Sequence, residues 1–254
     1  MKYQVSQYLK FLIRSTNQHG VHSPFVYSLV TKCFYDRKNY PAYKAITNYR
    51  KQLISNKESI TITDLGAGSH STTLNTRSVQ SIARHSGTPL KRTKLLYRLV
   101  NYLECQSVLE LGTSLGLSTQ AMALGNHTKI TTVEGCPSIA TFSKQHLQHL
   151  NNITLINSEF SSAIETLTTN TYDLVFFDGN HAKAATLNYF EALLESAHND
   201  SVFIFDDIYW SEGMTEAWET IKQHPKVKVT IDTFYWGFVF FRKEQVKEHF
   251  TIRI

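Results

Sequence analysis

The sequence predicts an α/β fold with a doubly wound, mostly parallel sheet, preceded by a helical N-terminal segment. From residue 106 onward, short apolar runs rich in Val, Ile and Phe alternate with amphipathic helical segments, which is typical of parallel strands covered on both faces. A glycine-rich turn follows the first of these runs. The last two runs have no helix between them, which predicts an antiparallel hairpin at or near the edge of the sheet.

The length of 254 residues gives room for one large domain with an appendage. We expect a helical N-terminal extension over residues 1–75 and the α/β domain over 76–254, with its sheet starting at about 106. No run approaches the roughly 20 apolar residues of a membrane span, and the first residues lack the pattern of a signal peptide. Cys33, Cys105 and Cys136 form no CxxC pair. These features favour a reduced, cytoplasmic protein and exclude a membrane protein or a disulfide scaffold.

Helical spacing of apolar residues predicts the N-terminal elements. Ser23-Pro24 has the pattern of an N-cap followed by proline at the first helical position. Tyr43, Ile46, Tyr49 and Leu53 share one face of a third helix. The other expected helices cover about 3–15, 24–34, 76–85 and 89–103.

Seven apolar runs are predicted as strands, and a short turn around Trp236-Gly237 is expected between the last two. The runs are Val108–Leu111, Ile130–Val133, Ile153–Ile156, Leu174–Phe177, Val202–Phe205, Val227–Ile231 and Phe238–Phe241.

Charge is divided unevenly along the chain. Residues 1–105 carry 16 Lys and Arg against 4 Asp and Glu, a balance of +12, whereas residues 106–254 carry a balance of −7. The positive charge of residues 1–105, here called the basic front, is compatible with an acidic small-molecule substrate, with nucleic acid, or with attraction between the two halves of the chain. We expect a small-molecule substrate, regard nucleic acid as the less favoured partner, expect no membrane partner, and leave a homodimer open.

The glycine turn lies between the first strand and a helix, with the sequence Gly112-Thr113-Ser114-Leu115-Gly116. Glycines there allow unusual backbone angles and let a ligand approach the main chain. Glu134 ends the next strand, 22 residues after Gly112, where doubly wound folds place a carboxylate that binds a ribose diol. The same five residues also spell GxSxG, the nucleophile elbow of serine hydrolases, with Asp178 or Asp206 and then His224 or His249 following in order.

Three carboxylates follow two other strands. Asp178 comes after the fourth strand, and Asp206 and Asp207 come after the fifth. Parallel strands bring their carboxyl ends to one side of a sheet, where clustered acids need a cation, protons or donors to offset their repulsion. Oxygen ligands of this kind suit Mg²⁺.

Two motifs, LELGTSLGLST and the DDIYW that begins at Asp206, resemble those of the class I S-adenosylmethionine (SAM)-dependent methyltransferases, in particular the catechol-type, metal-dependent O-methyltransferases. The resemblance covers about 76–242 and implies a Rossmann-like sheet with strand order 3-2-1-4-5-7-6 and an antiparallel last strand. The N-terminal half, with HGVHSPFVY, looks similar to an uncharacterised bacterial branch of methyltransferase-like proteins.

The resemblance also implies roles for individual residues. SAM would be bound by Glu110, Gly112, Ser114, Gly116, Ser118, Glu134, Glu159, Phe160 and Asp178. A divalent cation, Mg²⁺ or another, would be held by Asp178, Asp206 and Asp207, although an asparagine is usual in place of Asp207. His181 stands where these enzymes have a lysine, and with Asp178 it would form the catalytic pair, taking the proton of a substrate hydroxyl.

The sequence also allows other interpretations. The basic front could serve an RNA methyltransferase, Ser114 could serve a hydrolase, or the chain could bind SAM without catalysis. Asp178 could cap a helix and His181 could order a carboxylate. A second glycine turn, Asp64–Ser69, and the His19 and His22 pair have no assigned role.

Overall fold

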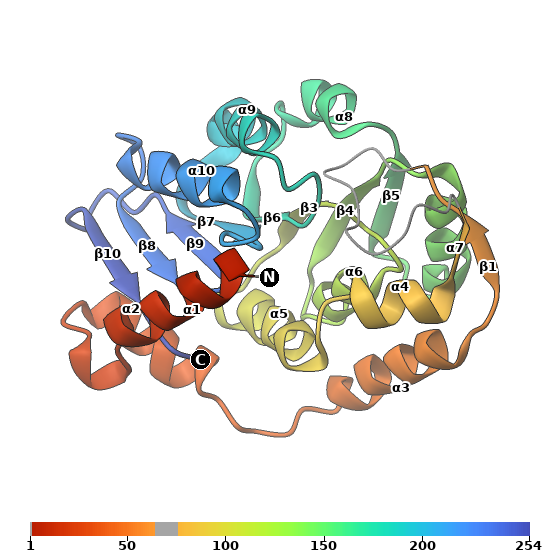
Figure 1. The fold of residues 1–254 in the computed structure, drawn as a ribbon, viewed down its shortest axis with the longest axis horizontal. Helices are drawn as coiled ribbons and strands as arrows, with labels where there is room; N and C mark the ends of the chain where they lie inside the picture. Colours follow the sequence, from red (N-terminus) through yellow and green to blue (C-terminus); the bar gives the residue numbers. More distant parts are fainter. Residues whose placement is uncertain (1, 64–75) are drawn as a thin grey trace. The chain divides into compact units, whose positions relative to one another are not determined.

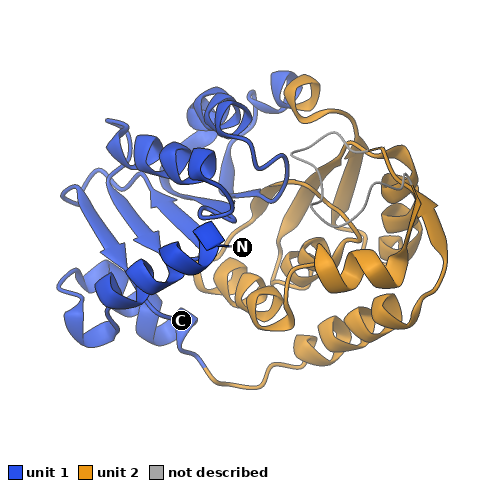
Figure 2. Ribbon diagram, in the orientation of Figure 1, with its two compact units in different colours: residues 1–36, 164–254 blue, residues 37–163 orange. Residues whose placement is uncertain are grey.

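The computed structural model describes residues 2–63 and 76–254, and its elements are drawn in Figure 1. The chain divides into two compact units, coloured separately in Figure 2. Unit 1 combines residues 1–36 with 164–254, and unit 2 is residues 37–163. The predicted boundary between 75 and 76 falls at the edge of the segment outside the described residues and stays a prediction. So does the second glycine turn, which lies within that segment.

Unit 2 contains three parallel strands in the order β3-β4-β5, which confirms the 3-2-1 part of the predicted strand order. A separate antiparallel pair, β1 and β2, precedes them. The elements of unit 2 are α3 (Ala42–Ser55), β1 (Ser59–Thr61), β2 (Thr76–Ser78), α4 (Val79–His85), α5 (Leu90–Tyr102), β3 (Ser107–Leu111), α6 (Leu117–Ala123), β4 (Lys129–Glu134), α7 (Pro137–Leu147) and β5 (Ile153–Asn157).

Unit 1 contains the strands β6, β7, β9, β8 and β10, adjacent in that order. β9 is antiparallel to both β7 and β8, and the other pairs are parallel. This confirms the 4-5-7-6 part of the order and the antiparallel last strand. The elements are α1 (Lys2–Arg14), η1 (Gln18–Gly20), α2 (Pro24–Leu29), η2 (Val30–Phe34), β6 (Tyr172–Phe177), α9 (Lys183–Leu193), η3 (Leu194–Ser196), β7 (Ala197–Asp206), α10 (Glu212–Gln223), β8 (Val229–Asp232), β9 (Trp236–Phe240) and β10 (Glu248–Thr251); α8 (Phe160–Leu167) crosses the boundary between the units.

The sheet of unit 1 is covered on both faces because side chains alternate along β9. Phe238 and Phe240 point to one face and contact Phe34 and Phe25 of the α2–η2 segment. Gly237 points to the other face, where an added Cβ would lie 2.6 Å from the Trp218 ring of α10. An apolar strand with helices on both sides matches the continuous hydrophobic runs in the sequence.

In unit 2, the buried face of α3 joins one hydrophobic core with α4, α6 and α7. Tyr43, Ile46, Tyr49 and Leu53 are all buried in it, as their helical spacing predicts. The hydroxyl of Tyr49 donates a 2.6 Å hydrogen bond to the carbonyl of Leu115 in the glycine turn. Helix α3 therefore supports the turn directly.

One capping prediction is confirmed, two local placements are wrong, and one strand of unit 1 was missed. The side chain of Ser23 caps α2 by accepting from the amide of Val26. Residues 76–78 form β2 instead of the start of a helix, and Trp236-Gly237 lies within β9 instead of in a turn. Strand β10 was not predicted. None of the helices in the described part of the chain is both long enough and apolar enough to cross a membrane.

Candidate active site

The glycine turn of unit 2 has a left-handed backbone at three positions. The φ angles are 111° at Gly112, 47° at Ser114 and 77° at Gly116. Residues other than glycine rarely adopt backbone angles in this region. The amides of Gly112 and Thr113 both donate to the carbonyl of Val133, at 2.9 and 3.2 Å. The end of β4 therefore holds the turn in place.

Glu134, at the end of β4, accepts a backbone hydrogen bond on each of its two carboxylate oxygens. The amide of Ser114 donates to Oε2 and the amide of Cys136 donates to Oε1, each at 2.9 Å. Burial raises the pKa of Glu134, and the backbone donors partly oppose that rise. The predicted ribose-binding carboxylate is thus held against the glycine turn while its side chain stays partly exposed.

Glu110 on β3 has no exposed surface. Its Oε2 accepts hydrogen bonds from the hydroxyls of Thr119 at 2.5 Å and Thr132 at 2.7 Å, and its Oε1 has no partner among the described residues. Burial raises the pKa of Glu110 to about 8, while the two hydroxyl donors act against the rise and the charge of Glu134 adds to it. In this structure Glu110 links β3, β4 and α6 beneath the turn.

The remaining predicted cofactor residues of unit 2 lie in different surroundings. Ser118 is buried, and its hydroxyl lies 2.9 Å from that of Thr88 just before α5. Glu159 is exposed, and Phe160 is half-buried at the first position of α8. Contact of these residues with a cofactor stays a prediction.

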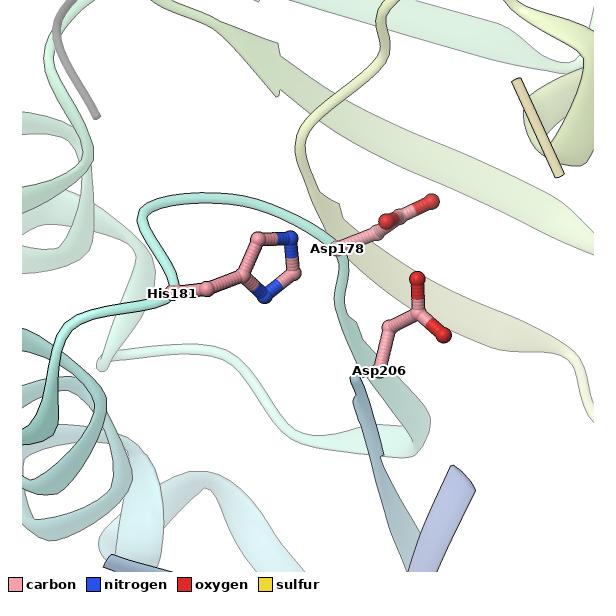
Figure 3. Close-up of side chains that lie close together, drawn as sticks. All are labelled: Asp178, His181 and Asp206. Atoms are coloured by element: carbon pink, nitrogen blue, oxygen red, sulfur yellow. The ribbon is translucent and has the colours of Figure 1, made fainter. Parts of the chain in front are cut away.

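The acidic residues of unit 1 meet because their strands are in register. Phe177 of β6 pairs with Phe205 of β7, so the next residue on each strand, Asp178 and Asp206, comes at the same carboxyl edge. His181 follows on the loop after β6, and Figure 3 shows its ring turned toward the two carboxylates. One potential ligand atom from each of the three residues lies within 4.8 Å of the others.

Asp207 is not a member of this group. Its backbone has a φ of 53°, so the chain turns sharply directly after Asp206. Asn180, directly before His181 in the loop after β6, also has a left-handed φ of 48°. Burial lowers the pKa of His181, and the carboxylate of Asp206 opposes that effect. The neutral imidazole, with a lone pair available as a ligand or a base, is thereby favoured.

The serine hydrolase interpretation finds no support in unit 1, because its histidines pair elsewhere. His224 lies 3.8 Å from Glu191, and Nδ1 of His249 lies 2.8 Å from the hydroxyl of Thr230. A catalytic triad needs a histidine that is bonded to an aspartate, here Asp178 or Asp206, and neither of these contacts supplies that pair. Likewise, the only group of three metal-type ligands within residues 2–63 and 76–254 is Asp178, His181 and Asp206, so His19 and His22 are in none.

Sequence reasoning missed a polar network in which the buried side chains of Tyr209 and Asp232 bond to each other and the exposed Arg14 bonds to Tyr209. The hydroxyl of Tyr209 donates to Oδ2 of Asp232 at 2.6 Å and accepts from Nη2 of Arg14 at 3.0 Å. The amide of Phe234 donates to the other oxygen of Asp232 at 2.8 Å. Helix α1 is therefore joined to the loop after β7 and to the turn between β8 and β9. The three side chains are far apart in sequence, and no motif marks them.

Comparisons with known proteins agree with this architecture. Residues 109–208 match the family model of a methyltransferase domain. No curated protein is similar enough in sequence to count as a relative. Among solved structures, SAH-bound PaMTH1 from Podospora anserina matches with a TM-score of 0.59 at 12% identity, over 88% of this chain and 98% of that one.

Two further solved structures are O-methyltransferases. TomG from Streptomyces achromogenes, involved in tomaymycin synthesis and solved with SAM, matches with a TM-score of 0.57 at 16% identity, over 84% of this chain and 95% of that one. An enzyme from Bacillus cereus in complex with SAH matches with a TM-score of 0.52 at 17% identity, over 82% and 93% of the two chains.

The fold is thus the Rossmann-like α/β fold of the SAM-dependent methyltransferases, as the sequence predicts. The matched residues run from β3 to the loop after β7. The family match agrees with the methyltransferase class that the two motifs predict, and O-methylation itself stays a prediction.

Proposed function

We propose that the protein is a SAM-dependent O-methyltransferase that acts on a small hydroxylated molecule and uses a divalent cation. The observation that carries the proposal is the meeting of Asp178, His181 and Asp206 at the carboxyl ends of β6 and β7, within a chain that has a methyltransferase domain. In this proposal the glycine turn and Glu134 bind the cofactor, and the three-residue cluster binds the acceptor.

The residues of the glycine turn fit the proposed cofactor. Gly112 and Gly116 take left-handed backbone angles that shape the turn, and the space beside Gly116 is filled by the side chain of Leu147. Glu134 is fixed by the amides of Ser114 and Cys136 and keeps an exposed part that could accept hydrogen bonds from ribose hydroxyls. We assign Glu110 a supporting role, because its carboxyl group is sealed beneath the turn.

The cluster in unit 1 fits a divalent cation. It offers two carboxylates and one imidazole from two rigid strand ends and a short loop. Carboxylates suit Mg²⁺ and Mn²⁺, whereas an imidazole ligand shifts preference toward transition metals. We therefore expect Mn²⁺ or a similar ion to bind more tightly than Mg²⁺ if His181 is a ligand, and Mg²⁺ to suffice if His181 is the base.

The chemistry assigned to the residues is simple. SAM, when bound, supplies an electrophilic methyl group, and a bound cation would orient the acceptor hydroxyl and lower its pKa. Asp178 and Asp206 would hold that cation. If His181 is not itself a ligand, its neutral ring takes the proton that leaves the hydroxyl.

Calorimetric titration of the protein with SAM, with and without Mg²⁺ or Mn²⁺, tests the cofactor assignment first. We expect micromolar binding. Hydroxylated acceptors, including acidic ones, are then screened by following the conversion of SAM to SAH. Tight SAM binding without methylation of any hydroxyl compound would leave a non-catalytic SAM-binding protein. Absence of SAM binding would refute the proposal altogether.

A further inference from the structure

Three helices on unit 2 combine many cations with no acidic residue. Segments 37–57 and 79–103, which contain α3, α4 and α5, carry eleven Lys and Arg and no Asp or Glu. α3 packs against both α4 and α5, so their outer faces form one basic surface, here called the α3–α5 surface. Ordinary surface helices mix both signs, because pairs of opposite charge stabilise them and like charges repel.

The two units differ sharply in how their cations are balanced. Unit 1 has a net charge of −3, and its lysines and arginines form pairs such as Lys183–Glu216, Lys226–Glu195 and Arg242–Asp200. Unit 2 has a net charge of +8. Lys44, Lys51 and Lys91 are exposed on the α3–α5 surface, and none has an ion pair with the described residues. The repulsion among these cations is not offset within the helices that carry them.

Aromatic rings lie among the cations where α3 meets α5. Tyr40, Tyr43 and Tyr97 contact one another edge-on, with ring centroids 5.4 to 5.8 Å apart. The ammonium of Lys94 lies 4.7 Å from the centre of the Tyr43 ring, and Nη1 of Arg98 donates to the Tyr43 hydroxyl at 2.9 Å. Tyr40 and Tyr97 are partly exposed. Lys91, Lys94 and Arg98 follow one another at helical spacing and so share one face of α5.

We propose that the α3–α5 surface binds single-stranded nucleic acid. Exposed lysines along two packed helices match the repeated charge of a phosphate backbone. The partly exposed rings of Tyr40 and Tyr97, held rigid by their contacts, offer bases a stacking surface next to the cations. The proposal concerns unit 2 alone and does not depend on the methyltransferase activity.

The test measures binding of a fluorescent single-stranded RNA of about 20 nucleotides by anisotropy, with single-stranded DNA of the same sequence in parallel. The variant Lys44→Gln, Lys51→Gln, Lys91→Gln removes three exposed charges from the surface. The control Lys10→Gln, Lys32→Gln, Lys243→Gln removes three exposed charges from unit 1. Both variants change net charge equally, so general attraction to a polyanion affects them alike.

We expect the surface variant to lose about tenfold in affinity for the RNA. The slope of log affinity against log salt concentration should also become shallower by about 2. The control variant should stay close to wild type in both measurements. Tighter binding of RNA than of DNA, or the reverse, identifies the natural strand. Equal losses in both variants, or no loss in the surface variant, would overturn the proposal. Displacement of the RNA by poly-glutamate at equal charge concentration would also overturn it, because an acidic polypeptide would then be the better partner.

Discussion

The amide of Ser114 donates a 2.9 Å hydrogen bond to Oε2 of Glu134. This bond joins one of the three left-handed residues of the glycine turn to the acid at the end of the neighbouring strand, and the amide of Cys136 donates to the other carboxylate oxygen. Glu134 therefore has two functions in the proposal, since it shapes the turn and faces the ribose.

Glu134→Ala should weaken SAM binding by at least about tenfold, because it removes a charge-assisted acceptor and leaves two backbone donors unpaired. Glu134→Gln, which retains one carbonyl oxygen, should lose less. Calorimetry measures both. Glu165→Ala is the control, because that carboxylate is exposed on α8 and has no assigned role in cofactor binding. An affinity loss for Glu165→Ala as large as that for Glu134→Ala would contradict the assignment.

Glu110 should make the protein less stable as the pH rises. Its pKa is raised to about 8 in the folded protein and lies near 4.3 in an unfolded chain, so the folded state binds the proton more tightly. Stability is then fully retained below the unfolded value and falls as pH rises toward 8. Relative to Glu110→Gln, wild type should lose up to about 1.4 kcal/mol per pH unit in this window.

Thermal unfolding of wild type and Glu110→Gln between pH 5 and 9 measures that difference. Gln can keep a carbonyl oxygen toward the hydroxyls of Thr119 and Thr132, so the variant tests charge with little change of shape. Melting temperatures that run parallel across the whole range would show that Glu110 does not titrate there.

The sequence patterns predicted the strands well because each buried strand is a continuous apolar run. They missed β10 because Glu248–Thr251 mixes polar and apolar residues and is only partly buried at the edge of the unit 1 sheet. They also placed Trp236 and Gly237 in a turn, since glycine usually marks one. In the structure Gly237 is a strand residue whose missing side chain makes room for Trp218.

From the sequence, only those parts of the candidate site that follow from the pairing of parallel strands could be predicted. Asp178 and Asp206 meet because they follow paired residues of two parallel strands. Membership of His181 instead of Asp207 depends on left-handed loop residues whose conformation no motif specifies. The sealed position of Glu110 depends on the pairing of β3 with β4, which puts Glu110 opposite Thr132. Sequence spacing alone does not reveal that pairing.

Metal binding should distinguish the two possible ligand sets. Asp206→Asn and His181→Gln should each weaken binding of Mn²⁺ by tenfold or more, whereas Asp207→Asn should change it little, because Asp207 lies outside the cluster. Electron paramagnetic resonance of free Mn²⁺ gives the affinities. If Asp207→Asn loses binding and His181→Gln keeps it, the ligands are the three aspartates and His181 is not among them.

Tyr209→Phe should destabilise unit 1 by about 1–3 kcal/mol. The change removes a buried hydroxyl that donates to Asp232 and accepts from Arg14, and it leaves an oxygen of Asp232 without that donor. Tyr27→Phe on α2 is a control, since that side chain is 46% exposed and should change stability by less than about 0.5 kcal/mol. Equal stability of the two variants in urea unfolding would show that the network contributes nothing.

Two glycine substitutions should have opposite effects on stability. Gly116 caps α6 with a φ of 77°, and an added Cβ would lie 2.6 Å from Cδ1 of Leu147. Gly116→Ala should therefore destabilise the protein by about 1–3 kcal/mol and weaken SAM binding through the distorted turn.

Gly213 lies in the first turn of α10, where the nearest neighbour of an added Cβ is 3.4 Å away. Gly213→Ala should be neutral or stabilise by up to about 1 kcal/mol, because alanine restricts the unfolded chain. Unfolding curves and SAM titrations of both variants measure these effects, and a Gly116→Ala protein as stable as wild type would mean that the turn adapts freely to a side chain.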